Sequence, residues 1–288
     1  MEAKLPKFIS KEEAHKIFDD WLEKLEIKDR KKEIEELVIY ELTDGTRTST
    51  DLKGWKAYFD GGLFILRLVH LLNILGAKKF YVLTTGQKHR VRDNYNEIID
   101  ALVQEVGVYK KFAKENNIKL RFIGDLENMN YPHADVFKKA LKGLEKETRD
   151  NKFELFVLID YSSEWATHDK EFQKLPNANV IVKHTKGQVN EGLWLPTKLQ
   201  GNSFVYAQNG SMSSIWSDKD LIFLIASTFR SMLLHKGQQY GKSYKEGETE
   251  YIRRKREDEL SMVYKKFSAK PKKRIVMFGQ IGPEIYEF

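Results

Sequence analysis

Short apolar runs alternate with longer amphipathic segments along most of this chain. Runs rich in Val, Ile, Leu and Phe predict strands, whereas apolar residues at every third or fourth position predict helices. The predicted strands are 37–39, 80–83, 118–123, 153–159, 180–182, 203–207 and 274–278, and the predicted helices are 57–75, 95–115, 134–148 and 221–234. Alternating strands and helices build right-handed βαβ units. We therefore predict an α/β fold, a single domain with a central, mostly parallel sheet flanked by helices.

The composition narrows the class of protein. The 288 residues include no Cys, which excludes disulfides, thiolate metal sites and a Cys nucleophile. The chain has no run of 18 apolar residues that would predict a transmembrane helix, and its first residues lack the apolar core of a signal peptide. We therefore expect a cytoplasmic protein.

The two ends of the chain differ from its middle. Ser10 and Glu13 form a capping box that opens a helix, so we assign residues 1–36 to an N-terminal helical segment. Residues 37–240 are the predicted α/β domain, and residues 241–288 are a basic C-terminal extension.

Positive charge is concentrated near the C-terminus. Residues 236–274 hold 13 Lys and Arg against 6 Asp and Glu, which accounts for the whole net charge of +7. Such a segment suits phosphate groups, nucleic acid or peripheral contact with an anionic membrane, and it is equally compatible with a solvated tail. Nucleic acid is the least favoured of these partners, because the Tyr residues of the segment form no clear stacking platform.

The most informative strand end is the one that runs into Asp44-Gly45, a turn dipeptide. Thr46, Arg47 and Thr48 follow at once. Open α/β sheets bind their ligands at the carboxyl ends of strands. A carboxylate followed by hydroxyls and a guanidinium suits a phosphate ligand, with Mg²⁺ held by Asp44. The alternative is that Asp44-Gly45 is an ordinary turn.

Other strand ends are also rich in polar residues, namely His89, Arg90, Arg92, Asp160, Lys183 and His184. Because this edge carries many cations and few acids, it favours a phosphate or diphosphate ligand. His89 fits a functional role and an ordinary loop position equally well. The sequence contains no GxxxxGK[ST], GxGxxG, HExxH or GxSxG motif, so the familiar nucleotide-binding, zinc-protease and serine-hydrolase sites have no support.

The order of these motifs resembles that of the cis-prenyltransferases, the undecaprenyl-diphosphate-synthase-like enzymes, over about residues 37–240. Residues 43–47, Thr-Asp-Gly-Thr-Arg, are similar to the Met-Asp-Gly-Asn-Arg signature of that family. Residues 117–125, Asn-Ile-Lys-Leu-Arg-Phe-Ile-Gly-Asp, are the closest local match. Residues 215–218, Ile-Trp-Ser-Asp, resemble the family's Leu-Trp-Pro-Asp stretch.

The resemblance implies a parallel sheet with an apolar tunnel, a homodimer, and Mg²⁺-assisted condensation of an allylic prenyl diphosphate with isopentenyl diphosphate. It implies catalytic roles for Asp44 and His89, with Asp44 as the metal ligand. The substrate-binding residues that it implies are Gly45, Thr46, Arg47, Thr48, Tyr58, Gly86, Arg92 and Lys183.

Several positions depart from the family pattern. Tyr58 stands where the family has His, Gly86 and His89 stand where it has Ser and Asn, and Thr48 replaces a second Arg. Two functions therefore stay open. The first is a divergent prenyltransferase that uses isopentenyl diphosphate or another acceptor. The second is a non-catalytic prenyltransferase-like subunit, paired with an active one, or a lipid-phosphate-binding protein.

Overall fold

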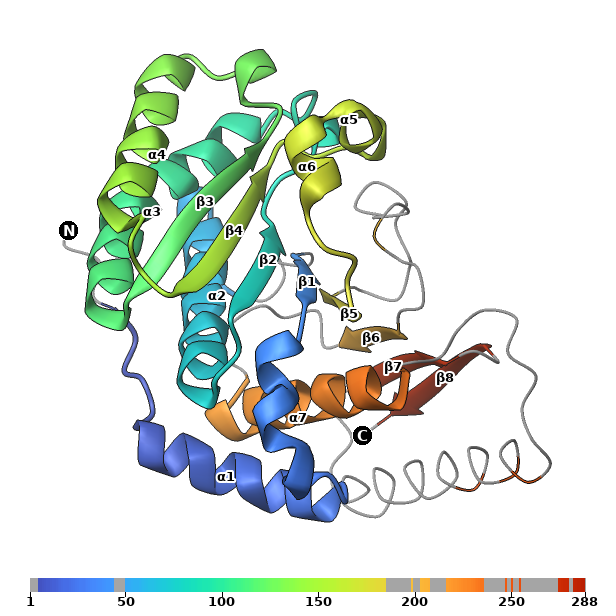
Figure 1. Ribbon diagram of the computed structural model, residues 1–288. Coiled ribbons are helices and arrows are strands. Elements are labelled where there is room, and N and C mark those ends of the chain that lie inside the picture. Colours follow the sequence, from blue (N-terminus) through green and yellow to red (C-terminus); the bar gives the residue numbers. More distant parts are fainter. Residues whose placement is uncertain are drawn as a thin grey trace.

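A computed structural model gives the structure of the protein (Figure 1). It describes residues 5–43, 50–184, 203–207, 216–235, 274–279 and 282–287, together with residues 198, 247, 250 and 254. The α/β fold and the mostly parallel central sheet that the sequence predicts are both confirmed.

The described strands form one sheet in the order β3-β4-β2-β1-β5-β6-β7-β8. Strands β1 to β6 run parallel, whereas β7 and β8 add an antiparallel pair at one edge. The bounds are β1 Ile39–Leu42, β2 Lys79–Leu83, β3 Ile118–Gly124, β4 Phe153–Ile159, β5 Val180–His184, β6 Ser203–Ala207, β7 Arg274–Gly279 and β8 Gly282–Glu287. The sequence analysis identified all of these strands except β8.

Helices cover both faces of the sheet (Figure 1). The larger layer consists of α1, α2, α3, α4 and α7, and the smaller layer on the opposite face consists of α5 and α6. The bounds are α1 Lys11–Lys24, α2 Trp55–Leu75, α3 Tyr95–Asn116, α4 Ala134–Thr148, α5 Ser163–His168, α6 Lys170–Lys174 and α7 Asp218–His235. Residues 28–36 form a 3₁₀ helix between α1 and β1.

Two predicted boundaries move for local reasons. The first strand begins at Ile39 rather than at 37, because the N–H of Leu37 still closes the 3₁₀ helix on the carbonyl of Ile34. Helix α7 begins three residues before position 221, because Ser217 caps it. The Ser217 hydroxyl accepts the N–H of Asp220 at 3.2 Å, and the Asp220 carboxylate accepts the N–H of Ser217 at 2.9 Å.

Among the described helices, α2 alone is long and apolar enough to cross a membrane by length and composition. It lies inside the larger layer, where Phe64, Leu68 and Leu72 are at most 2% exposed. The helix ends at Gly76, whose φ of 103° lies in the left-handed region that favours glycine. Burial in the protein interior therefore accounts for the apolar sequence of α2.

The N-terminal helix belongs to the same core. Trp21 of α1 packs on Phe223 of α7 with ring centroids 4.4 Å apart, and Phe18 packs on Phe229 at 6.3 Å. Arg230 of α7 also donates from Nε to the carbonyl of Leu25 at 3.2 Å. Helix α1 thus completes the larger layer, while the domain boundaries at residues 36 and 240 stay predictions.

Side chains of α4 accept hydrogen bonds from backbone N–H groups on the outer edge of β3. The Thr148 hydroxyl accepts the N–H of Leu120 at 3.0 Å, and the Glu145 carboxylate accepts the N–H of Phe122 at 2.8 Å. These side chains occupy backbone donors that would otherwise offer a template for another strand.

A buried carboxyl group lies where α2 meets α3. Glu105 of α3 is 5% exposed, and a Cβ added to Gly62 of α2 would lie only 2.1 Å from its Oε1. Glycine at position 62 therefore makes room for this acid. Burial raises the pKa of Glu105 well above its usual value, because the charged form loses its hydration.

Glu105→Gln is expected to stabilise the protein increasingly as pH rises. At low pH the carboxyl is protonated in the folded and the unfolded chain alike. As pH rises, the unfolded chain releases the proton first, so wild-type stability falls until the pH reaches the raised folded-state pKa. The difference in free energy of unfolding between the variant and the wild type should grow by at least about 1.4 kcal/mol as pH rises. This is the free energy that corresponds to a shift of one pKa unit.

Urea unfolding between about pH 4 and pH 8 measures this difference. Glu115→Gln, at an exposed position near the end of α3, is the matched control and should show no such trend. A constant difference between Glu105→Gln and wild type over this range would contradict the prediction.

Candidate functional site

The carboxyl edge of the sheet contains a topological switch point. Strand β1 lies between β2 and β5; the chain continues from β1 to β2 on one side, and β5 pairs with β6 on the other. Open α/β sheets bind ligands in the crevice where the strand order reverses in this way. Leu42 of β1 pairs with Lys183 of β5, so the segment after β1 and the end of β5 leave the sheet side by side.

The signature segment starts at this crevice. Thr43 donates its N–H and its hydroxyl to the carbonyl of Leu83, at 3.3 and 2.5 Å, which ties the end of β1 to the end of β2. The residues that follow lie outside the described part of the chain, as does the side chain of Lys183. The roles predicted for Asp44, Gly45, Thr46, Arg47, Thr48 and Lys183 therefore stay predictions.

The loop after β2 lies on the other side of β1 and contains two predicted site residues in direct contact. Gly86 bridges to Tyr161, and its N–H donates to Nδ1 of His89 at 3.1 Å. A neutral imidazole that accepts at Nδ1 carries its proton on Nε2. His89 therefore holds the backbone of Gly86 with one nitrogen and is a hydrogen-bond donor at the other.

A partly buried ion pair fixes this loop on the ends of β3 and β4. Asp160 has no exposed surface, and its Oδ2 accepts from Nε of Arg90 at 2.9 Å and from the hydroxyl of Tyr95 at 2.6 Å. Nη2 of Arg90 also donates to the carboxylate of Asp125 at 2.9 Å. The hydroxyl of Thr85 donates to Oδ1 of Asp160 at 3.1 Å.

This network changes the interpretation of the polar strand ends. The sequence places Arg90 and Asp160 at an edge that suits a phosphate ligand, but the structure pairs them with each other. Burial lowers the pKa of Arg90, but its bonds to the two carboxylates raise it by more, so the net shift is upward. Burial and the bond to Asp160 likewise raise the pKa of Tyr95 far above its usual value. Arg90 is thus a structural cation that positions His89 and Gly86.

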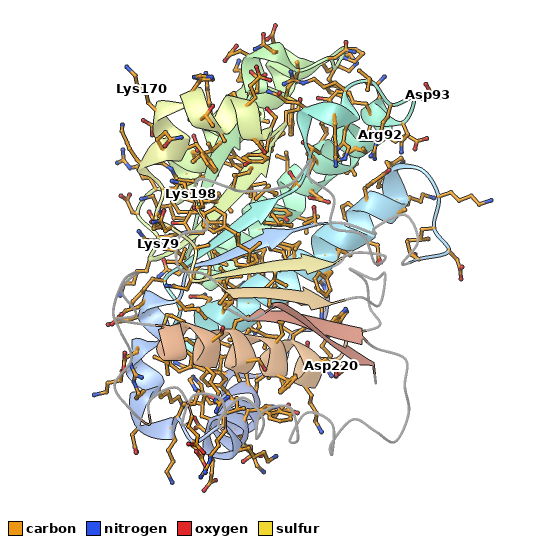
Figure 2. All side chains as sticks on the ribbon, turned by 90° about the vertical axis from the view of Figure 1, so that its right-hand side faces the viewer. Lys79, Arg92, Asp93, Lys170, Lys198 and Asp220 are labelled. Atoms are coloured by element: carbon orange, nitrogen blue, oxygen red, sulfur yellow. The ribbon has the colours of Figure 1, made fainter. Side chains whose placement is uncertain are left out.

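Two further predicted site residues, Tyr58 and Arg92, lie near the carboxyl edge of the sheet. The hydroxyl of Tyr58, in the first turn of α2, accepts from Nδ2 of Asn94 at 2.6 Å, which joins α2 to the start of α3. Arg92 is exposed in the loop between β2 and α3. Figure 2 shows Arg92 at this carboxyl edge, whereas Lys79 and Lys198 lie at the opposite end of the strands.

The described residues do not form a magnesium site. Asp125 and Asp160 follow β3 and β4 at the carboxyl edge, and both are bound to Arg90. Within the part of the chain that the structure describes, no group of three or more His, Asp or Glu residues could hold a metal ion. The proposed Mg²⁺ therefore depends on Asp44, which lies outside that part.

With this architecture, the chain has the fold of the cis-prenyltransferases, as its sequence resemblance predicted. Lavandulyl diphosphate synthase from Lavandula x intermedia, in complex with dimethylallyl diphosphate, matches with a TM-score of 0.51 and 14% identity, over 73% of this chain and 98% of that one. A probable undecaprenyl diphosphate synthase from Campylobacter jejuni matches with a TM-score of 0.48 and 12% identity, over 72% and 99%. No protein-family model and no curated protein sequence matches this chain.

Asp160→Asn is expected to lower the free energy of unfolding by about 3 kcal/mol, because the partly buried Arg90 guanidinium then keeps only the Asp125 carboxylate as a charged partner. Asn tolerates the left-handed backbone of position 160, whose φ is 53°, so the substitution isolates the charge. Urea unfolding measures the loss.

Asp150→Asn is the control, since the Asp150 side chain is 87% exposed in its pair with Arg149 and should change stability by less than about 0.5 kcal/mol. If Asp160→Asn and Asp150→Asn lowered the free energy of unfolding equally, the Arg90–Asp160 pair would not be what holds the loop.

Proposed function

We propose that this protein is a divergent prenyltransferase, which transfers the prenyl group of an allylic diphosphate to isopentenyl diphosphate or to another acceptor. The observation that carries the proposal is the switch point. Strand β1, which ends shortly before the Asp44-Gly45 signature, and strand β5, which contains Lys183, are neighbours there, and Leu42 of β1 is paired in register with Lys183.

The reaction breaks the bond between the allylic carbon and the diphosphate oxygen, so negative charge develops on the leaving diphosphate. Groups that stabilise this charge more in the transition state than in the bound substrate accelerate the reaction. Arg47 and the backbone N–H groups after Gly45 are the proposed donors to the leaving diphosphate, and Lys183 is proposed to bind the diphosphate group of isopentenyl diphosphate. The new carbon–carbon bond forms at the acceptor, which then loses a proton.

The fold supports this class of substrate, because lavandulyl diphosphate synthase, which has a similar fold, is in complex with dimethylallyl diphosphate. Within this chain, the hydrogen bond from the N–H of Gly86 orients His89 in the loop after β2, and the Arg90–Asp160 pair holds this loop in place. Asp44 is proposed to orient the leaving group and to hold Mg²⁺.

The alternative is a non-catalytic subunit or a lipid-phosphate-binding protein. It is favoured by Gly86, which offers no hydroxyl where the family has Ser, and by the hydrogen bond that already occupies the N–H of Gly86. The alternative keeps diphosphate binding at the crevice but no turnover. The homodimer, the cytoplasmic location and contact of the basic extension with a bound diphosphate stay predictions.

Asp44→Asn is expected to lower the rate of prenyl transfer by two to four decades, about 3–5 kcal/mol of transition-state stabilisation. Asn keeps the turn and removes the charge, so a turn defect is separated from a loss of electrostatics. The assay combines isopentenyl diphosphate with dimethylallyl and longer allylic diphosphates in the presence of Mg²⁺, and mass spectrometry identifies the product.

The matched control is Asp51→Asn, because Asp51 is exposed close to the same segment. A near wild-type rate for Asp44→Asn would make Asp44 a turn residue and remove the catalytic part of the proposal. A folded wild type that binds the diphosphates without forming product would favour the alternative.

His89→Asn and His89→Ala test the loop after β2. Asn is the residue that the family has at this place, and its side-chain oxygen can accept the N–H of Gly86 while its amide donates to a ligand. We expect His89→Asn to retain activity within about tenfold and His89→Ala to lose about a hundredfold or more. Equal activity of Ala and wild type would show that His89 has no part in the reaction.

A further inference from the structure

The buried residue Glu105 lines a small cavity between two helices and the sheet. Helices α3 and α4 lie side by side against β3 and β4 (Figure 1), and residues of all four elements form the cavity wall. The cavity is partly open to solvent and has a free volume of about 20 Å³, which is room for one water-sized group. Strand β2 separates β4 from β1, so this cavity is distinct from the crevice where β1 and β5 meet.

The wall of the cavity is almost entirely apolar. Leu102 and Val106 contribute to it from α3, Leu141 from α4 and Val157 from β4. Tyr109, one turn further along α3, is the only other lining residue with a polar or titratable side chain. A group that enters the cavity therefore meets one carboxyl group in apolar surroundings.

The carboxyl group of Glu105 lacks a partner. Within the part of the chain that the structure describes, no group hydrogen-bonds to it and no cation pairs with it, although the residue is only 5% exposed. Gly62 of α2 lies against it and brings no side chain that could donate. Burial raises the pKa of Glu105, and no neighbouring charge or hydrogen bond offsets this effect. A ligand that supplies the missing partner would therefore gain free energy at this place.

The chemistry of the cavity selects among positively charged partners. A metal ion requires several oxygen ligands, and Glu105 supplies the only carboxylate of the lining. A guanidinium group is planar and has five N–H donors, more than a single carboxylate in an apolar cavity can accept. A primary ammonium group is a compact charge on an apolar stem, so it fits both the water-sized space and the apolar wall.

We propose that this cavity is a binding site for a small primary alkylamine, whose ammonium group pairs with the carboxylate of Glu105. On binding, the ammonium group keeps its protons and Glu105 releases its proton to solvent. A charge-assisted hydrogen bond then replaces the unpartnered acid. The inference goes beyond prenyl transfer and does not depend on it.

Urea unfolding of the full chain in the presence of methylammonium chloride tests the proposal. A ligand that binds only the folded chain raises the free energy of unfolding as its concentration rises, and the dependence on concentration gives the Kd. For the wild type at about pH 8 we expect a millimolar Kd, because so small a ligand makes few contacts. Tetramethylammonium chloride at the same concentration is the control for size and ionic strength, and it should stabilise the protein less.

Substitution of the acid locates the site. Glu105→Gln and Glu105→Met both remove the charge, so the Kd for methylammonium should rise at least about tenfold in each. Glu115→Gln, at an exposed position near the end of α3, is the matched control and should bind like the wild type.

The pH dependence separates an ion pair from a neutral contact. Because binding displaces a proton from Glu105, the wild-type Kd should fall by up to about tenfold per pH unit between about pH 6 and pH 8, where methylammonium stays charged. Methanol, a neutral molecule of similar size, should bind more weakly and show no such dependence.

Three results would overturn the proposal. Equal stabilisation of the wild type by methylammonium and tetramethylammonium chloride would be an effect of salt outside the cavity. An unchanged Kd in Glu105→Gln and Glu105→Met would place the ammonium group elsewhere. Equal binding of methanol and methylammonium would make the cavity a site for neutral groups.

Discussion

Strand β1 is the element on which the rest of this structure depends. It has only four residues, yet it pairs with β2 on one side and β5 on the other, so it joins the two halves of the sheet. Its Tyr40 stacks on Tyr81 with ring centroids 4.4 Å apart, and Tyr81 stacks on Phe156 at 4.6 Å. The ring ladder crosses three strands and fixes their lateral order. Because parallel strands must be buried on both faces, α2 and α7 cover one side of β1, and α5 and α6 cover the other.

The same strand connects the fold to the proposed function. Reversal of the strand order at β1 and β5 creates a crevice whatever the sequence around it, and the signature segment leaves the sheet at that place. The partly buried pair of Arg90 and Asp160 serves the crevice indirectly. Because Arg90 is bound to Asp160, its charge is neutralised and is not directed at a phosphate ligand. The pair instead holds the loop that contains His89 in place. The strand order forms the crevice, and the Arg90–Asp160 pair positions the loop beside it.

Similarity of fold and similarity of sequence are decoupled in this protein. At 14% identity to lavandulyl diphosphate synthase, the shared property is the arrangement of strands and helices. Within this arrangement, the packing depends on individual residues of this chain, as at Gly62, where the missing side chain makes room for the buried carboxyl of Glu105 between α2 and α3. Such a carboxyl opposes folding at neutral pH, because burial raises its pKa above the value in the unfolded chain.

The sequence by itself determined the alternation of elements. Helix α4 and strand β4 have the bounds that periodicity predicted, and Gly76 ends α2 as a left-handed residue, because local spacing and backbone preference decide these features. Only the tertiary structure decided which polar groups meet. Arg90 and Asp160 are 70 positions apart, and no local pattern encodes their contact. Lys198 carries a charge, yet it is 3% exposed, with its ammonium donating to the carbonyl of Leu175 at 2.7 Å. Pairings of this kind follow from the packing of distant segments, which the sequence specifies only through the whole fold.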